Sequence, residues 1–328
     1  MTLSSLGEFA LIRRLAGLLS DPSPEDVILG IGDDAAVLRF GSEYLVATTD
    51  TMVDGVHFIG ERVPWEDTGW KSLASNVSDI AAMGATPLFA LVTLALPADA
   101  RVEDSEALYA GLRACAGAYG VAVVGGDIVR APQVSITVAL LGRSEQRDGN
   151  PLLLRRDGAQ VGDVIAVVGT VGDSAAGLLR LLEGASADDP LARAHLHPVP
   201  NVAVGVKAVA AGIRCGIDVS DGLLQDIGHI CEMSGVGAIV RALDVPISDE
   251  LRRAYPEDVL RLACTGGEDY QLVLAAPHPL IEALAKLVTE RISIIGEIVE
   301  SPDHRARLLD ADGNESSFPQ TGWDAFRS

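Results

Sequence analysis

Six short acidic segments recur along this chain, and they constrain its fold more strongly than any other feature. Most of them lie beside glycines or at the end of an apolar segment rich in β-forming residues. They span residues 32–34, 48–58, 72–83, 125–127, 217–226 and 266–270. A turn explains any single segment, because Asp and Gly are common in turns. Six of them, with no compensating basic clusters, favour a fold that gathers the carboxylates into one site for several metal ions and a phosphate group.

The length and composition indicate a globular protein with two domains. At 328 residues the chain can form two domains of ordinary size, each with its own core. Hydrophobic residues make up 48% and aromatic residues only 4%, so we expect a core built mainly from Ala, Val, Leu and Ile. Between residues 143 and 162 the sequence becomes polar and rich in glycine, as domain junctions are. We therefore predict two domains, 1–146 and 147–328.

The net charge and the spacing of the cysteines exclude several classes of protein. A formal net charge of -21 argues against binding to nucleic acid or to an anionic membrane, so an anionic ligand would need a metal ion. No apolar stretch has the length of a membrane span or the form of a signal peptide, and we expect a cytoplasmic protein. The cysteines lack zinc-ligand spacing and are expected to be reduced, buried thiols. They are Cys115, Cys215, Cys231 and Cys264.

Both halves of the chain mix helices and strands, which predicts an α+β fold. Ser4 and Ser5 are expected to cap an opening helix that runs to Leu18. Expected strands cover 27–31, 35–40, 44–49, 88–96, 121–124, 134–142, 164–168, 238–240, 270–275 and 292–298. Expected helices cover 64–83, 103–119, 174–182, 201–211 and 223–233.

Two common nucleotide-binding motifs can be set aside. The chain has no G-x-x-x-x-G-K-[ST] sequence, so it is not a P-loop enzyme. Gly30, Gly32 and Ala35 match G-x-G-x-x-A, but the residues that follow read as a strand instead of the helix that would hold a pyrophosphate. The adjacent Asp33 and Asp34 are either a hairpin turn or part of a metal site.

Residues 48–58 combine hydroxyls and carboxylates at the end of a predicted strand. Oxygen ligands of this kind, such as Thr48, Thr49 and Asp50, suit Mg²⁺. His57 lies far from any Cys or other His, which makes a poor transition-metal site, so we interpret it as a substrate contact. The alternative is a capped loop with a surface histidine.

One face of the helix that ends at Gly84 carries Ser72, Asn76 and Asp79. A solvated face would normally carry Lys and Glu, whereas alanines surround these residues, and we therefore favour a closely approached, functional surface. Gly125 and Gly126 follow a predicted strand and would place Asp127 at the end of that strand. A simple turn is the alternative there.

The second half of the chain holds two further acidic segments. Asp218, Ser220 and Asp221 follow a strand and precede a helix, whose N-terminus attracts anions, and Ser220 or Asp221 is expected to cap that helix. Glu268 belongs to the second segment, which precedes another strand. The glycine-rich turn 169–174 either contacts a phosphate or packs against the protein, and we favour packing.

The acidic motifs also carry a family resemblance. In order they read G-I-G-D-D-A-A, T-T-D-T-M-V-D-G-V-H-F, N-V-S-D-I-A-A-M-G-A, G-G-D, D-V-S-D-G-L and G-G-E-D-Y. Together they resemble the thiamine-monophosphate kinase family over nearly the whole chain. That family belongs with aminoimidazole ribonucleotide synthetase, selenophosphate synthetase and hydrogenase maturation proteins.

The resemblance implies a two-domain fold like that of aminoimidazole ribonucleotide synthetase. Its N-terminal mixed α/β domain would bind ATP and Mg²⁺ and dimerise through its sheet, and its C-terminal α+β domain would complete the active site. The implied activity is phosphorylation of thiamine monophosphate to thiamine diphosphate by in-line transfer from ATP, the last step of thiamine diphosphate biosynthesis. The alternatives are another ATP-dependent synthetase of this superfamily and a non-enzymatic nucleotide-binding scaffold.

The resemblance also implies roles for individual residues, with no side chain acting as a general base. Implied Mg²⁺ ligands are Asp34, Thr48, Thr49, Asp50, Asp79, Asp127, Asp218 and Asp221. Implied ATP contacts are Gly126, Asp127, Arg156 and Ser220. Implied contacts to thiamine monophosphate are His57, Glu268 and Trp323, which offer a carboxylate and an aromatic face to a cationic thiazolium. Asp33, Asn76 and Asp226 are second-rank candidates.

Overall fold

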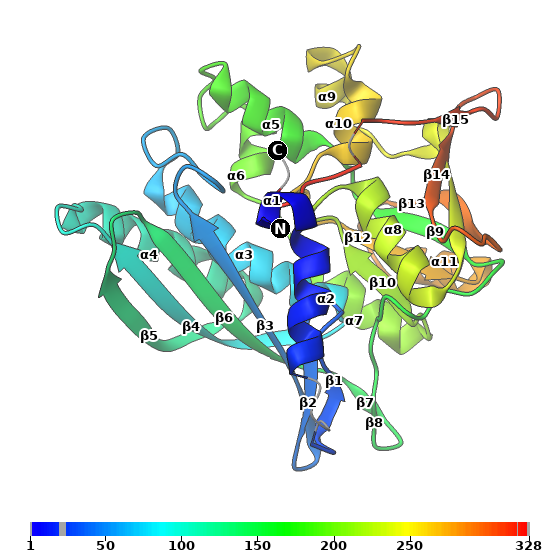
Figure 1. Cartoon of the computed structure of the whole chain (residues 1–328), viewed down its shortest axis with the longest axis horizontal. Coiled ribbons are helices and arrows are strands. Elements are labelled where there is room, and N and C mark those ends of the chain that lie inside the picture. The colour runs from blue at the N-terminus through cyan, green and yellow to red at the C-terminus, as the bar shows by residue number, and fades with distance from the viewer. Residues whose placement is uncertain (1, 20–23, 320, 327–328) are drawn as a thin grey trace.

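The computed structural model describes residues 2–19, 24–319 and 321–326, and it forms two lobes, each built on a β-sheet (Figure 1). The first sheet has the strand order β1-β2-β3-β6-β4-β5, and its pairs are antiparallel except for β4 with β5. Its strands are β1 (Val27–Leu29), β2 (Ala36–Phe40), β3 (Glu43–Val53), β4 (Thr86–Leu96), β5 (Ala122–Arg130) and β6 (Ser135–Arg143).

Two long helices, α3 (Trp65–Ala82) and α4 (Val102–Tyr119), cover one face of this sheet. They approach each other closely at two glycines, since a Cβ at Gly69 would lie 1.9 Å from the Leu108 carbonyl oxygen. A Cβ at Gly111 would lie 1.8 Å from the Glu66 carbonyl oxygen. On the opposite face of the sheet, Phe89 and Leu91 of β4 are exposed.

The second sheet has the order β10-β12-β9-β13-β11-β14-β15. Its strands are β9 (Val164–Val168), β10 (Cys215–Asp218), β11 (Gly237–Arg241), β12 (Leu272–Ala276), β13 (Ile292–Val299), β14 (Ala306–Leu309) and β15 (Glu315–Ser316). Both faces are covered, because alternate residues of β9 enter two different cores: Ile165 and Val167 pack in one, Ala166 and Val168 in the other.

The helices of the second half are mostly short. They are α5 (Asp173–Leu182), α6 (Pro190–Leu196), α7 (Val202–Ala211), α8 (Leu223–Ser234), α9 (Asp249–Ala254), α10 (Val259–Thr265), α11 (His278–Ala285) and the 3-10 turn η1 (Ala242–Asp244). Helical spacing in the sequence predicts α5, α7 and α8 but not the others, which are too short to show a clear helical period. The predicted boundary at residue 147 falls in a hairpin of β7 (Gln146–Arg147) and β8 (Asn150–Pro151).

The opening helix corrects one prediction. The structure divides it into α1 (Leu3–Leu6) and α2 (Glu8–Leu18), because Gly7 between them has a positive φ of 81°. Ser4 and Ser5 therefore lie inside α1, and Thr2 precedes it. A positive φ is open to glycine at little cost, which explains why the helix breaks there.

Helix α3 joins the two halves of the molecule. One side of α3 packs on the first sheet, and its C-terminal end meets α7, where a Cβ at Gly205 would lie 2.3 Å from the Ala81 carbonyl oxygen. This contact brings the acidic end of α3 to the end of β10. The four cysteines are free and buried, as predicted. Within the described residues, no helix is both long and apolar enough to cross a membrane.

Candidate active site

Three carboxylates from three separate elements meet between the two sheets. Asp34 follows β1, Asp79 lies on α3 and Asp218 ends β10, and one ligand oxygen of each lies within 4.8 Å of the others. Burial, together with the charge of Asp34, raises the pKa of Asp218 to about 8. Burial also raises the pKa of Asp79, and Asp50 and Asp218 add to the effect. The three groups repel one another when ionised, so a cation among them would be strongly favoured.

Two oxygens of this cluster have no hydrogen-bond partner among the described residues. They are Asp34 Oδ2 and Asp218 Oδ1, and both are buried. The neighbouring oxygens are satisfied, since Thr48 Oγ1 donates to Asp79 Oδ2 at 2.5 Å and Ser78 Oγ donates to Asp218 Oδ2. Buried carboxylate oxygens without partners are costly, and hard oxygens are the ligands that Mg²⁺ prefers. The residues present therefore fit the metal site that the sequence predicts.

The raised pKa values predict how metal-free protein responds to pH. Because the pKa of Asp218 is raised from its usual value near 4 to about 8, the folded state binds a proton that the unfolded state releases between these values. The contribution of this group to the free energy of unfolding is therefore complete at low pH, and it is lost as pH rises from about 4 through about 8. With a chelator present, we expect the free energy of unfolding to fall by on the order of 2 kcal/mol from pH 6 to pH 8. Urea titrations at both pH values measure this, and a rise in stability would contradict it.

Arg156 supplies the positive charge of this region. Its guanidinium donates to Asp34 Oδ1, and its backbone N–H donates to Asp33 Oδ2 at 3.2 Å. Burial and the Asp34 charge raise the pKa of Asp33 to about 6, although Arg156 opposes this. The family resemblance implies that Arg156 contacts ATP, and in the structure its side chain pairs with Asp34, a predicted metal ligand. No sequence signal within residues 150–160 shows this pairing, because it joins residues more than 120 positions apart.

Strand β3 separates the residues of its acidic segment. Thr48 and Asp50 face α3, where the backbone N–H of Asp50 donates to Asn76 Oδ1 at 3.1 Å. Because strand side chains alternate, Thr49 points to the opposite face, and its hydroxyl donates to the Val138 carbonyl oxygen. The structure therefore does not bring the Thr49 hydroxyl to the carboxylate cluster. Residues 48–53 of this segment lie in β3, which runs to Val53 and is longer than the predicted strand, and residues 54–58 follow its end.

A pocket of about 580 Å³ opens beside the cluster. Asp50 and Asp79 lie on its wall, and so do the three predicted substrate residues, His57, Glu268 and Trp323. Much of the remaining wall is apolar. It includes Phe9, Met52, Phe58, Ile59, Val63, Leu178, Leu181 and Leu182. The pocket therefore combines an anionic end with an apolar wall, which suits a ligand that carries both phosphate and aromatic rings.

Two of the predicted substrate residues are fixed by hydrogen bonds. His57 Nδ1 accepts from the Val53 backbone N–H at 3.1 Å, so the ring proton of neutral His57 lies on Nε2. Trp323 is held through its backbone, whose N–H donates to the Asp221 carbonyl oxygen at 3.0 Å. Gln225 Nε2 donates to the Trp323 carbonyl oxygen at 2.7 Å. Trp323 is 51% exposed, so its indole can cover a ligand.

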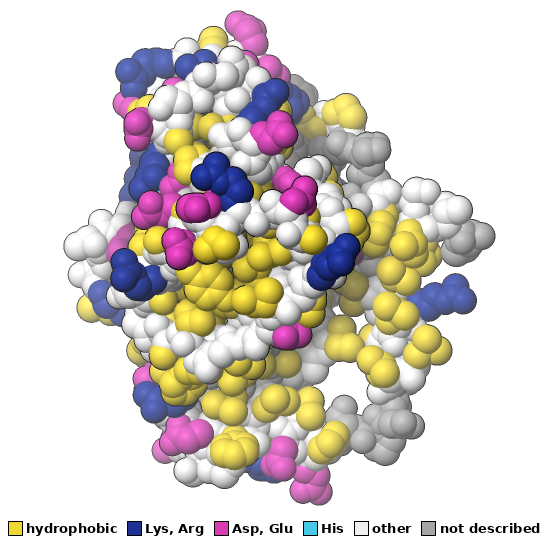
Figure 2. Space-filling view, turned by 90° about the vertical axis from the view of Figure 1, so that its left-hand side faces the viewer, with side chains coloured by type: hydrophobic (Ala, Val, Ile, Leu, Met, Phe, Trp, Pro, Cys, Tyr) yellow, Lys and Arg dark blue, Asp and Glu magenta, His cyan; other side chains and the backbone are white. Residues whose placement is uncertain are grey.

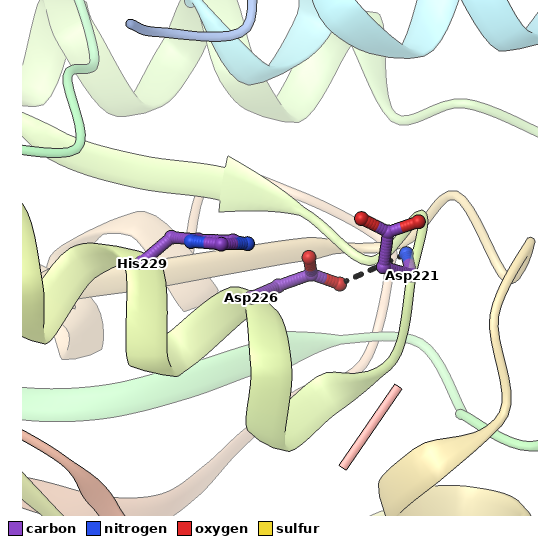
Figure 3. A group of neighbouring side chains, drawn as sticks. All are labelled: Asp221, Asp226 and His229. Carbon is purple, nitrogen blue, oxygen red and sulfur yellow. Dashed lines mark hydrogen bonds between the residues drawn. The ribbon is translucent and has the colours of Figure 1, made fainter. Parts of the chain in front are cut away.

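Asp226 shapes the loop that follows β10 (Figure 3). Its Oδ2 accepts from the backbone N–H groups of Ser220, Asp221 and Gly222 at 3.2, 3.3 and 3.0 Å. The prediction that Ser220 or Asp221 caps α8 is wrong, because Gly222 is the residue before the helix and the Asp226 carboxylate takes up these donors from the first turn. Because neither side chain caps the helix, Ser220 and Asp221 can both line the pocket.

Asp127 lies away from the other predicted ligands. The structure continues β5 through Gly125 and Gly126, so Asp127 is inside the strand, and the prediction that it ends one is wrong. A register shift between β4 and β5 accommodates the glycines, and a Cβ at Gly126 would lie 1.8 Å from the Val92 carbonyl oxygen. β5 is the edge strand farthest from β1, with β4 and β6 between it and β3. One chain alone therefore does not bring Asp127 to the cluster.

The glycine-rich turn 169–174 packs against the protein, as predicted. Asp269 Oδ2 accepts from the Gly172 N–H at 2.6 Å, and Asp269 Oδ1 accepts from the Ser174 N–H at 3.0 Å. A carboxylate of the chain itself thus occupies the N-terminus of α5, where a phosphate would otherwise bind. Burial raises the pKa of Asp269 to about 8.

Comparisons with known proteins agree with this architecture. Residues 32–144 match the family AIR synthase related protein, N-terminal domain, and residues 160–308 match its C-terminal domain. A solved structure of hydrogenase maturation protein HypE in complex with ATP shares the fold at 22% identity, with a TM-score of 0.70 over 95% of this chain and 96% of that one. The chain belongs to the AIR synthase related family of two-domain proteins.

Its relatives place it more narrowly. Thiamine-monophosphate kinase of Escherichia coli (strain K12) is 41% identical over 279 residues, which cover 83% of each chain. Thiamine-monophosphate kinase of Synechococcus elongatus is 36% identical over 321 residues, which cover 94% of each chain. The solved structure of AaThiL complexed with AMPPCP and TMP superposes with a TM-score of 0.86 at 34% identity, over 99% of this chain and 98% of that one. Within its superfamily, the chain belongs to the thiamine-monophosphate kinases.

Proposed function

We propose that this protein transfers the γ-phosphoryl group of ATP to thiamine monophosphate and forms thiamine diphosphate and ADP. One observation carries the proposal: the Asp34, Asp79 and Asp218 cluster lies beside a pocket whose wall holds His57, Glu268 and Trp323. The names of the relatives and the ligands of the AaThiL complex support it. We place this reaction in the cytoplasm, where free cysteines stay reduced.

The proposed phosphoryl transfer requires charge neutralisation more than it requires a general base. The acceptor phosphate is already ionised near neutral pH, so in-line attack on ATP needs no strong proton acceptor. Bound Mg²⁺ would neutralise the two approaching polyanions, and Asp34, Asp50, Asp79 and Asp218 are the residues that would hold it. The chain itself orients these carboxylates, through Thr48 on Asp79 and Ser78 on Asp218. The buried cluster also excludes water from the phosphate groups.

The pocket explains the choice of acceptor. Glu268 is ionised: burial alone would raise its pKa, but the charge of Lys71 and its hydrogen bond hold that pKa below the usual value. An ionised carboxylate and an exposed indole suit a cationic thiazolium ring, which Trp323 can cover with its π-face. The apolar wall suits the rest of the ring system. Charge at one end and aromatic contact at the other therefore select a phosphorylated cation.

We further propose that the protein is a homodimer joined along β5. Every residue of β5 is exposed, and an unpaired edge strand of this length invites pairing with another strand. Figure 2, which looks onto the side that carries α4 and β5, shows hydrophobic side chains gathered on it. Exposed hydrophobic residues of β4 and β5 are Phe89, Leu91, Val123, Val124, Ile128 and Val129. Residues 1–146 would then form the ATP, Mg²⁺ and dimerisation domain, and residues 147–328 would complete the site.

This arrangement gives Gly126 and Asp127 a role that a single chain does not. Both lie on the exposed β5 edge, and pairing of two such edges would carry them toward the partner chain. We assign them to the nucleotide and its Mg²⁺ at the interface between two chains. The implied contacts of Arg156 and Ser220 with ATP stay part of this proposal.

A coupled assay for ADP tests the function directly. Purified protein with ATP and Mg²⁺ should release ADP when thiamine monophosphate is added, and it should release none with thiamine as acceptor. An aminoimidazole ribonucleotide precursor in place of thiamine monophosphate tests the nearest alternative, a synthetase of the same superfamily. ADP release with that precursor alone would reject the kinase. ATP binding with no ADP release for any acceptor would favour the scaffold.

Trp323→Ala should weaken binding of thiamine monophosphate selectively. The change removes the exposed indole, whereas the backbone contacts to Asp221 and Gln225 stay possible. We expect KM for thiamine monophosphate to rise about tenfold, the size of a strong cation-π contact, with little change in KM for ATP. Trp323→Phe, which keeps an aromatic face, is the matched control and should recover most of the loss. Equal losses for both substrates would contradict the assignment.

A further inference from the structure

A buried ion pair connects the two halves of the molecule behind the pocket. Lys71 Nζ on α3 lies 2.8 Å from Glu268 Oε1 in the loop before β12. The Lys71 side chain is only 3% exposed, and lysines are almost never buried so completely without a partner. Lys71 does not line the pocket, whereas Glu268 does. Lys71 thus touches the pocket only through other residues.

His195 completes the surroundings of Lys71 as a neutral group. Its Nε2 lies 3.2 Å from Lys71 Nζ, and an ammonium group only donates, so Nε2 is the acceptor and the ring proton lies on Nδ1. Nδ1 in turn faces Ser174 Oγ at 3.0 Å and Glu268 Oε2 at 3.7 Å. Burial and the Lys71 charge lower the pKa of His195 to about 4, which keeps it neutral. The buried positive charge beside Glu268 is therefore that of Lys71.

The backbone of Glu268 is held in an unusual conformation. Its φ is 64°, and that of Tyr270 is 52°, values that residues other than glycine adopt only when their surroundings enforce them. The Glu268 N–H donates to the Ser220 carbonyl oxygen and the Tyr270 N–H to the Val219 carbonyl oxygen, both at 2.8 Å. Asp269 between them is bound to the N-terminus of α5. The loop is thus fixed by its backbone, and Lys71 fixes the side chain of Glu268, which lines the pocket.

We propose that Lys71 is a positioning residue for the acceptor substrate, which pins one carboxylate oxygen of Glu268 so that the ionised group faces a cationic, phosphorylated ligand in the pocket. This inference rests on the proposed function, in which Glu268 contacts the thiazolium. Lys71 lies about two helical turns from Asp79 on α3. The same helix therefore carries a predicted metal ligand and positions Glu268, the proposed contact to the substrate cation. Helix α3 therefore fixes the distance between the groups that would bind the two ends of the substrate.

Three variants test this role: Lys71→Met, Glu268→Gln and the double variant. Steady-state kinetics with saturating ATP and Mg²⁺ should show that Glu268→Gln raises KM for thiamine monophosphate about tenfold, with less than about threefold change in KM for ATP. Lys71→Met should raise the same KM by a similar factor. The double variant should be no worse than Glu268→Gln alone, because Lys71 acts through Glu268. If the two single effects multiply in the double variant, Lys71 acts independently and the proposal is wrong.

Further comparisons separate a loss of folding from a loss of the positioning role. Lys71→Met leaves a buried carboxylate without its cation and can destabilise the protein, whereas the double variant removes both charges and should fold. Comparison of the double variant with Glu268→Gln therefore decides the question even if Lys71→Met does not fold. Lys286→Met removes an exposed lysine and should leave both KM values unchanged. Failure of the proposed function looks different, because wild-type protein would then release no ADP with thiamine monophosphate.

Discussion

Asp218→Asn is expected to lower kcat at least about a hundredfold while it makes metal-free protein more stable. The two effects have one cause. Asp218 is fully buried beside Asp34 and Asp79, and its Oδ1 has no hydrogen-bond partner among the described residues. In metal-free protein, folding either protonates Asp218 or buries its charge, and both cost free energy. An amide avoids this cost, and it also removes a ligand oxygen for Mg²⁺. Ordinary structural residues lose stability when they are truncated, so a gain marks a functional carboxylate.

Thermal unfolding with and without Mg²⁺ measures both parts of this prediction. In wild-type protein, Mg²⁺ should raise Tm, and the increase should be larger at pH 8 than at pH 6, where protons compete for the carboxylates. Asp218→Asn should raise Tm in the presence of a chelator and shrink the effect of Mg²⁺. Asp312→Asn, in the exposed turn between β14 and β15, is the matched control. A variant with a near-normal rate at saturating Mg²⁺ would overturn the metal site.

The site could be predicted from sequence as far as its parts are local motifs. The acidic segments, the strands that carry them and the face of α3 with Asn76 and Asp79 follow from residue types and spacing, and the structure brings Asp34, Asp79 and Asp218 together. Glycine in a strand was harder to interpret. Gly125 and Gly126 indicate a turn by composition, yet they lie in β5, where the β4 backbone leaves no room for a Cβ at Gly126.

Contacts between distant segments could not be predicted. Arg156 pairs with Asp34, and Lys71 pairs with Glu268, across sequence separations that no local pattern records. Lys71 meets Glu268 because α3 packs against both halves of the molecule, and Arg156 meets Asp34 where the loop after β8 lies against the loop after β1. Thr49 shows the opposite case, since the alternation of strand side chains alone places it across the sheet from Thr48 and Asp50. The alternation of side chains along a strand is therefore enough to predict the position of Thr49, whereas the family resemblance implies that it is a ligand.

Mixing two inactive variants should restore activity if two chains share each site. Asp127→Asn and Asp50→Asn should each lose most turnover as purified proteins, because each removes a proposed Mg²⁺ ligand. In a mixed dimer, one site would combine both substitutions and the other would have neither. Random exchange makes about half of the dimers mixed, so about a quarter of wild-type activity should return in a symmetric two-chain assembly.

This prediction rests on the distance between Asp50 and Asp127 within one chain. Asp50 is on β3 and Asp127 on β5, with β6 and β4 between them, so neighbouring strands about 4.8 Å apart separate the two by roughly 14 Å. If activity stays absent after unfolding and refolding the variants together, Asp127 acts within its own chain or has no role. Ile128→Lys on the exposed β5 edge is a second measurement, because a charge there should block pairing. Sedimentation should then show a monomer, and turnover should fall with the loss of the dimer.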